Sequence, residues 1–92
     1  MEPTAGATLV TDEQLISRYI KPNPHRPGVA NAWVSEHAVP VWALVAYWEG
    51  VGQDIDRVAD DYDLPRDAIE AALAYYQRHR HAIDARIADN AA

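Results

Sequence analysis

The residues that follow Pro65 constrain the fold most, because neither glycine nor proline occurs between that position and the end of the chain. The segment from Pro65 to about Ala88 therefore predicts one helix, roughly 36 Å long at ~1.5 Å per residue. Its apolar residues follow a helical spacing, at Ile69, Leu73, Tyr76, Ile83 and Ile87. Arg80 stands where another apolar residue is due. Since so long a helix exceeds a small core, we expect its second half to pack on another chain.

Composition limits the class of protein. A chain of 92 residues with 49% apolar content forms one compact domain. Its net charge of −6 excludes a generally basic nucleic-acid-binding protein, and the lack of cysteine excludes disulfides and thiolate metal sites. The longest apolar run, Val39 to Trp48, is shorter than the roughly 20 residues that a membrane span needs. No export signal opens the chain, so we expect a cytoplasmic protein without membrane contact.

Three segments are expected along the chain. Residues 1–10, which open with the small and polar run of residues 1–7, predict a flexible N-terminus. Residues 11–28 predict a short helix, which begins at a Thr-x-x-Gln capping box on Thr11, and then a proline-rich loop without regular structure. Residues 29–92 predict the main domain, which ends in the long helix.

Within the main domain, alternating residues over 29–41 predict a short β-hairpin that turns near Glu36 and His37. Three helices are expected to follow, over 41–49 with a left-handed Gly50 as its stop, from the N-cap Asp54 to Tyr62, and from Pro65 onward. The predicted fold class is α+β, mainly α. It consists of a winged helix-turn-helix-like three-helix core preceded by the hairpin and the N-terminal helix.

The charges in the expected helix-turn-helix disfavour the usual DNA contact. Between residues 49 and 70 only Arg57 and Arg66 are cationic, against eight carboxylates, which are Glu49, Asp54, Asp56, Asp60, Asp61, Asp63, Asp67 and Glu70. Phosphates would repel the start of the last helix. The acidic surface is either a solvated face or a docking site for a basic protein. We place the partner contacts at Asp60, Asp61, Asp63, Leu73, Tyr76, Ile83 and Ile87.

Basic residues gather elsewhere, around the proline-rich loop and near the carboxyl end of the chain. If the protein binds DNA, these clusters are better candidates than the usual helix face. The candidate DNA contacts are Arg66, Arg78, Arg80 and Arg86. The three tryptophans could stack on bases, but in a chain without phenylalanine we expect them to fill the core.

The sequence offers no constellation for catalysis or for a metal. His79 and His81 are two positions apart on a helix, so their side chains point in different directions and cannot share an ion. Ser35, Glu36 and His37 are neighbours in an extended segment, so they cannot align as a relay. We therefore expect a non-enzymatic protein without cofactor or metal.

The stretch from about Pro24 to Asn90 resembles the bacterial family of domains of unknown function 433, and within it the VapB-type, antitoxin-like members of high-GC bacteria. The residues that carry the resemblance are Val39-Pro40-Val41-Trp42, Asp60-Asp61-Tyr62-Asp63-Leu64-Pro65, Ala71-Ala72-Leu73-Ala74-Tyr75-Tyr76, His79 and Ile83-Asp84-Ala85-Arg86. The resemblance implies a winged helix-turn-helix-like fold, a homodimer, and neutralisation of a PIN-like nuclease toxin. It also implies repression of the protein's own operon through operator DNA.

The chain departs from that family at the predicted turn of the hairpin. Family members commonly carry Gly-Thr-Arg there, whereas this chain has Glu36, His37 and Ala38. The arginine of the hairpin is therefore missing, and a carboxylate has appeared at Glu36. If that arginine helps family members to hold phosphate, any DNA contact of this chain is weakened or moved. Our leading hypothesis is an antitoxin-like regulator that docks its acidic run on a basic nuclease groove. The alternative is a dimeric adaptor or structural domain with no nucleic-acid role.

Overall fold

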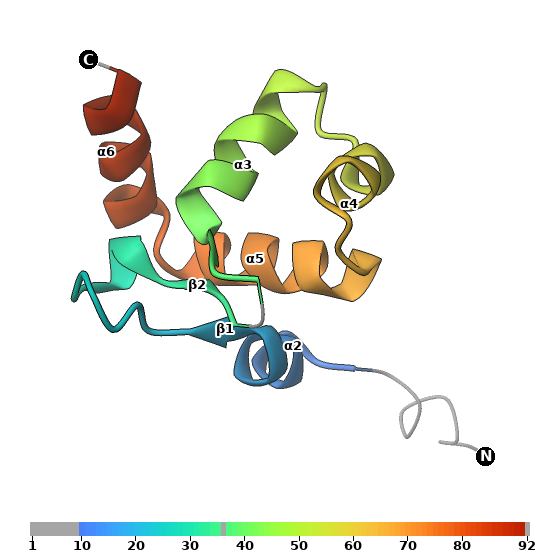
Figure 1. Ribbon diagram of the computed structural model, residues 1–92, viewed down its shortest axis with the longest axis horizontal. Coiled ribbons are helices and arrows are strands. Elements are labelled where there is room, and N and C mark those ends of the chain that lie inside the picture. The colour runs from blue at the N-terminus through green and yellow to red at the C-terminus, as the bar shows by residue number, and fades with distance from the viewer. Residues whose placement is uncertain (1–9, 36, 92) are drawn as a thin grey trace.

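The computed structural model describes residues 10–35 and 37–91, which form five α-helices, one 3-10 helix and a three-stranded antiparallel sheet (Figure 1). In chain order these elements are α2 (Asp12–Tyr19), β1 (Ile20–Lys21), η1 (Val29–Asn31), β2 (Trp33–Val34), β3 (Val39–Pro40), α3 (Val41–Gly50), α4 (Ile55–Tyr62), α5 (Arg66–Arg78) and α6 (Arg80–Ala91). The α+β, mainly helical class is confirmed. The predicted flexible segment lies outside the described residues except for Val10, and so does Glu36.

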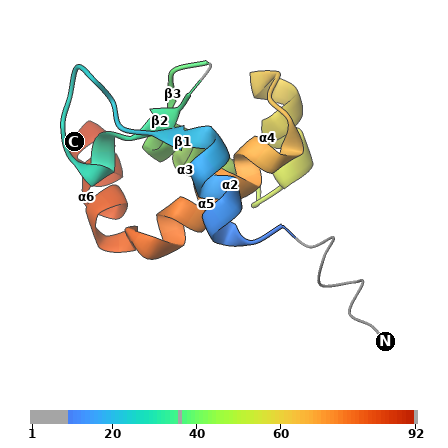
Figure 2. The same cartoon turned by 90° about the horizontal axis from the view of Figure 1, so that it is seen from below.

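Helix α5 is the central element of the core. It contacts α2, α3 and α4, and Figure 2 shows α2 lying against it. Four of its small or branched residues, Ala68, Ile69, Ala71 and Ala72, are buried. Alanine at these positions lets neighbouring helices approach closely, so apolar contacts surround α5 on several sides. Helix α5, whose start was already a poor DNA contact because of its carboxylates, thus has much of its surface covered by the other helices.

The predicted hairpin is confirmed, but the sheet has a third strand that the sequence did not predict. In the hairpin β2 pairs with β3, and the backbone N–H of Ala38 donates to the carbonyl oxygen of Val34 at 2.8 Å. Strand β1 pairs with β2 at the positions Ile20↔Val34 and Lys21↔Trp33. Strand β1 has only two residues, which lie between the end of α2 and the first proline of the loop. So short a segment has no strand pattern of its own, and its conformation therefore depends on the pairing with β2. Val29, expected in a strand, begins the 3-10 helix η1 instead.

Helix starts follow the sequence signals, whereas one expected helix stop is wrong. Thr11 and Gln14 form the predicted capping box, and the Asp54 carboxylate accepts from the backbone N–H of Arg57 at 3.1 Å. Gly50 does not end α3 in the left-handed conformation. It is the last helical residue, and the left-handed positions are Gly52 and Gln53, with φ of 73° and 63°.

The expected single long helix is broken at His79, whose φ of −132° and ψ of 34° end α5. Helix α6 then turns away from α5 and packs on α3 and η1 (Figure 1). The side chain of Ile83 is completely buried in this contact, and the Arg86 guanidinium lies 4.5 Å from the ring centroid of Trp42. The expectation that this half packs on another chain is therefore wrong, because the break turns its apolar residues onto the domain itself. None of the described helices is long and apolar enough to cross a membrane.

Candidate functional site

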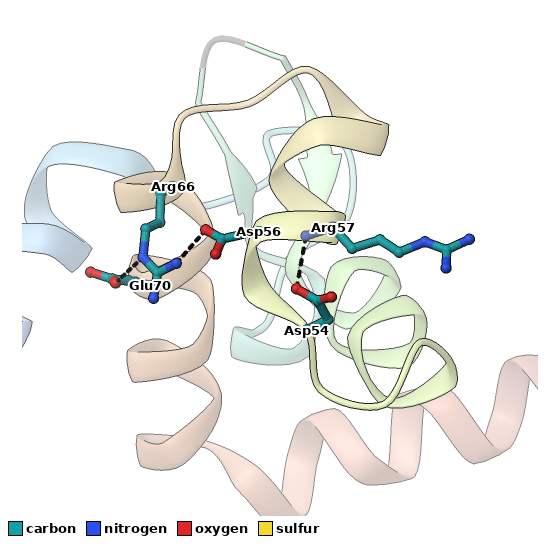
Figure 3. Close-up of polar contacts among 5 residues, drawn as sticks. All are labelled: Asp54, Asp56, Arg57, Arg66 and Glu70. Atoms are coloured by element: carbon teal, nitrogen blue, oxygen red, sulfur yellow. Dashed lines mark hydrogen bonds and ion pairs between the residues drawn. The ribbon is translucent and has the colours of Figure 1, made fainter.

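Helix α4 and the first turn of α5 form a surface that is rich in carboxylates. We call it the acidic face and define it by Asp54, Asp56, Asp60, Asp61, Asp63, Asp67 and Glu70. Its two arginines are both engaged within it. Arg66 pairs with Asp56 and, at 2.9 Å, with Glu70 (Figure 3), while Arg57 contacts Asp61 at 3.4 Å. Exposed pairs of this kind contribute only about 0–1 kcal/mol each to stability, so they mainly fix side-chain positions.

Several carboxylates of the acidic face remain free to meet a partner. Asp60, Asp63 and Asp67 are exposed, and none forms an ion pair with another residue in the described ranges. Asp56, Asp60 and Asp63 follow one another at helical spacing, so they share one side of α4 and its end. After its two cations are paired, this face still carries a net negative charge.

Asp61 is held in place by two donors. The hydroxyl of Tyr47 in α3 donates to its Oδ2 atom, and the Nε–H of Arg57 approaches the same oxygen at 3.4 Å. The hydrogen bond from Tyr47, assisted by that from Arg57 and its positive charge, lowers the pKa of the Asp61 carboxyl below its usual value. Both donors favour the ionised form, so Asp61 keeps its negative charge under more acidic conditions than a free aspartate.

Beside the acidic face lies an apolar groove of about 350 Å³ between α2, α4 and α5. We call it the α2 groove; it is lined by Val10, Asp12, Leu15, Ile55, Glu70, Leu73, Ala74 and Gln77. Val10, which is 60% exposed, contributes apolar surface to this groove. The groove combines an apolar floor with carboxylates at its rim, an arrangement that suits an apolar side chain carried by a basic segment.

The structure separates the predicted partner residues into accessible and buried groups. Asp60, Asp61 and Asp63 lie on the acidic face, and Leu73 lines the α2 groove. Ile87 is half-buried against the core. The side chains of Tyr76 and Ile83 are inside the core, with at most 2% of their surface exposed, so they do not form part of the surface of this chain.

The α2 groove was not predicted from the sequence. Helical periodicity can place Leu15 and Ile55 on the apolar faces of two helices, but it does not show that these faces meet around a hollow. The only available signal was an apolar Val10 directly before the capping box, which the assignment of residues 1–10 to a flexible segment obscured.

The predicted DNA-contact residues do not form one cluster. Arg66 stands at the start of α5 and Arg78 at its end, which places them roughly 18 Å apart along the helix. Arg80 lies over the ring of Tyr76 at 4.8 Å from its centroid, and Arg86 lies over Trp42. Because α2 covers α5, that helix does not offer a free side along its length to a DNA groove.

Residues 30–76 match the family described as proteins of unknown function, DUF433, which spans just over half of the 92 residues. The chain belongs to this family. The matched region begins in η1 and ends at Tyr76, so it contains the hairpin, α3, α4 and most of α5, including the acidic face. Helix α2 and helix α6 lie outside it. Neither the comparison with curated proteins nor that with solved structures gave a match.

This boundary divides the α2 groove between the family region and its flank. Ile55, Leu73 and Ala74 come from the DUF433 region, whereas Val10, Asp12 and Leu15 come from the preceding segment. The described residues contain no group of three or more His, Asp or Glu side chains placed to hold a metal ion. The acidic face and the α2 groove together offer charge complementarity and apolar contact.

Proposed function

We propose that this protein is a non-enzymatic, antitoxin-like binding protein that neutralises a PIN-like nuclease toxin by docking the acidic face and the α2 groove on it. The observation that carries the proposal is the position of an apolar groove beside exposed carboxylates that form no ion pair within the described chain. Membership of the DUF433 family supports it through the resemblance of this chain to antitoxin-like members.

The chemistry of such a contact follows from the substrate of a nuclease. A nuclease that cleaves RNA holds phosphates in a basic groove, and carboxylates in that groove would occupy the positions of the phosphates. Charge complementarity supplies orientation and fast association, whereas the burial of apolar side chains such as Val10 and Leu73 slows dissociation.

The proposal also concerns the assembly of the protein, its location and its contact with DNA. We propose that the protein acts as a homodimer in the cytoplasm and that the hairpin with α3, α4 and α5 is a winged helix-turn-helix-like core. Repression of its own operon belongs to this proposal as well. The alternative is a non-enzymatic adaptor or structural domain with no nucleic-acid role, which predicts no toxic partner.

Coexpression with the product of the neighbouring reading frame tests the proposal. We expect that product to arrest growth alone, and the full chain to restore growth and to copurify with it. Reversal of charge in the double variant Asp60→Lys/Asp63→Lys should weaken the complex at least 100-fold, because each buried charge contact is worth about 2–5 kcal/mol. Leu73→Lys should weaken it through the α2 groove.

A matched control is Glu13→Lys/Asp89→Lys, which reverses two exposed carboxylates outside the acidic face. This variant should keep the affinity of the original chain. Equal losses in both double variants would show that net charge alone matters and would overturn the proposed surface. A harmless neighbour that never copurifies would favour the adaptor.

A further inference from the structure

The end of the molecule opposite α4 includes two segments that contain no carboxylate, residues 20–35 and residues 71–83, together with the rest of α6, which carries Asp84 and Asp89. Figure 1 and Figure 2 both show the loop after β1 and the junction of α5 with α6 on the side away from α4. The hydroxyl of Tyr75 in α5 joins the two segments by donating to the carbonyl oxygen of Val29 at 2.8 Å. Their Lys and Arg residues are Lys21, Arg26, Arg78 and Arg80.

These cations are not neutralised within the described chain. The ion pairs between described residues involve only Arg57 and Arg66, both in the acidic face. Lys21 donates from Nζ to the backbone carbonyl oxygen of Ser17 at 2.6 Å, which holds its ammonium in place without cancelling its charge. Among the described residues, Asp60, Asp63 and Asp67 thus carry charge without an ion pair around α4 and the start of α5. Cations without an ion pair lie toward the other end of α5, where α6 also contributes two carboxylates.

A second groove, of about 340 Å³, opens at this basic end. We call it the loop groove; its lining residues are Ile20, Lys21, Pro22, Gly28, Val29, Ala32 and Tyr75. Val29 is 47% exposed, and the volume lies within the range of about 300–1,000 Å³ that is usual for sites that enclose a small molecule. The groove is apolar apart from the Lys21 ammonium and the Tyr75 hydroxyl.

Hydrogen bonds within the proline-rich loop fix the rim of this groove. The Asn23 Oδ1 atom accepts from the backbone N–H groups of His25 and Arg26 at 2.8 and 3.2 Å. The Asn31 side-chain amide donates to the carbonyl oxygen of Pro27 at 3.0 Å. Arg26 is thus carried on a braced loop, and Arg78 follows Tyr75 by one helical turn, which places it on a neighbouring part of the α5 surface.

We infer that the loop groove binds single-stranded nucleic acid, with one base in the groove beside Tyr75 and the adjoining phosphates on Lys21, Arg26 and Arg78. An apolar hollow flanked by cations matches a nucleotide, whose base is flat and whose phosphates are charged. This site goes beyond the proposed protein contact and uses none of its residues. A paired duplex fits less well, because its bases are stacked inside and are not available to a hollow of this size.

A second copy of this chain is a less suitable occupant. Its acidic face would be complementary in charge, but the contact would join different surfaces of two copies. Such head-to-tail contacts form open filaments unless a rotation closes them into a ring. Self-association through the basic end is therefore an outcome to be detected in the test, and it counts against the inference.

The test measures fluorescence anisotropy of labelled oligo(dT) and oligo(U) of about 12 nucleotides, a typical site size for a small single-strand binder. A duplex of equal length and inorganic polyphosphate are the comparison ligands. Three phosphate contacts predict roughly 20-fold weaker single-strand binding at 200 mM salt than at 50 mM. Single strands should bind more tightly than duplex and than polyphosphate, which offers charge but no base.

Two pairs of variants separate local contacts from overall charge. Arg26→Gln/Arg78→Gln should weaken single-strand binding at least tenfold and reduce the dependence on salt, whereas Arg57→Gln/Arg66→Gln, with the same net charge, should change it less than twofold. Val29→Glu should weaken binding at least tenfold, whereas Val10→Glu should not. Thermal melts of each variant confirm that these exposed positions leave the fold intact.

The opposite results would overturn the inference. They are no binding of either oligonucleotide at 50 mM salt, equal losses in the members of either variant pair, or polyphosphate and duplex binding as tightly as single strands. Sedimentation that shows self-association of the original chain, lost in Arg26→Gln/Arg78→Gln, would assign the surface to a second copy instead. None of these outcomes bears on the acidic face, so the two proposals can fail separately.

Discussion

The Tyr76 hydroxyl in α5 donates to the Asp84 Oδ1 atom in α6 at 2.7 Å, across the break at His79. The Tyr76 side chain is only 2% exposed, and the Arg80 guanidinium lies over its ring. The hydrogen bond joins two helices that the sequence predicts as one. It therefore belongs to the contacts that hold α6 in its turned position.

Removal of this hydroxyl should loosen the α5–α6 junction. We expect Tyr76→Phe to lower the free energy of unfolding by about 1–2 kcal/mol, toward the low end because Asp84 is exposed. Urea denaturation measures the change. Tyr62→Phe is the control, since no hydrogen bond of the Tyr62 hydroxyl occurs among the described residues, and equal losses in both variants would contradict the assigned role.

The same contact predicts a dependence of stability on alkaline pH. The hydrogen bond to Asp84, together with burial, raises the pKa of Tyr76 to about 12 from an ordinary value of 10.0. The folded state thus favours the neutral phenol, and this stabilisation is complete below pH 10 and is lost as the pH rises from about 10 to about 12. The pKa values of Tyr47 and Tyr75 are raised as well, so an absorbance titration of tyrosinate should show several late-titrating groups, one of which disappears in Tyr76→Phe. A titration unchanged by the substitution would refute the assignment.

Ile83 should be the main apolar anchor of α6. Its side chain is completely buried between α6 and the rest of the core, so Ile83→Ala should cost about 2–5 kcal/mol. Ile87→Ala, at a half-buried position, should cost less. Hydrogen exchange should show faster opening of α6 than of α5 in Ile83→Ala. If α6 depended on another chain instead, this loss of stability would vary with protein concentration.

Replacement of Ala38 by glycine should stabilise the folded protein. It has a φ of 53° in the hairpin turn, a conformation that costs an L-residue about 1–2 kcal/mol, partly offset by the extra flexibility of glycine in the unfolded chain. We expect Ala38→Gly to raise the free energy of unfolding by up to about 1 kcal/mol. Ala43→Gly, inside α3, should lower it by about 1 kcal/mol. A loss of stability in Ala38→Gly would argue against the left-handed turn.

Asp61 should titrate below an ordinary aspartate, because the Tyr47 hydroxyl and then Arg57 favour its ionised form. A lowered pKa in the folded state gives stabilisation that is present above the ordinary value of 3.8 and is lost as the pH falls through the folded-state value. Carboxyl-carbon NMR of the original chain and of Tyr47→Phe measures this. The pKa of Asp61 should move upward in the variant, and an unchanged pKa would contradict the assigned contact.

The helix starts and the runs of carboxylates could be predicted from the sequence, because both depend on residues that are neighbours in the chain. The Thr11 capping box and the Asp54 cap each satisfy backbone N–H groups within three residues, so their side chains determine them locally. Likewise, the carboxylates of α4 share an exposed face because helical spacing puts them there. The sequence alone therefore determined the acidic face and most helix boundaries.

Only the tertiary structure decided the break at His79, the third strand and the two grooves. Residues 65–88 have the local properties of one helix, and the chain turns at His79 because Ile83 gains burial against α3 and η1. The Lys21 strand requires a partner from β2, and each groove needs walls from segments distant in sequence. These features arise from the free energy of burying apolar surface between distant segments, which no local pattern of side chains contains.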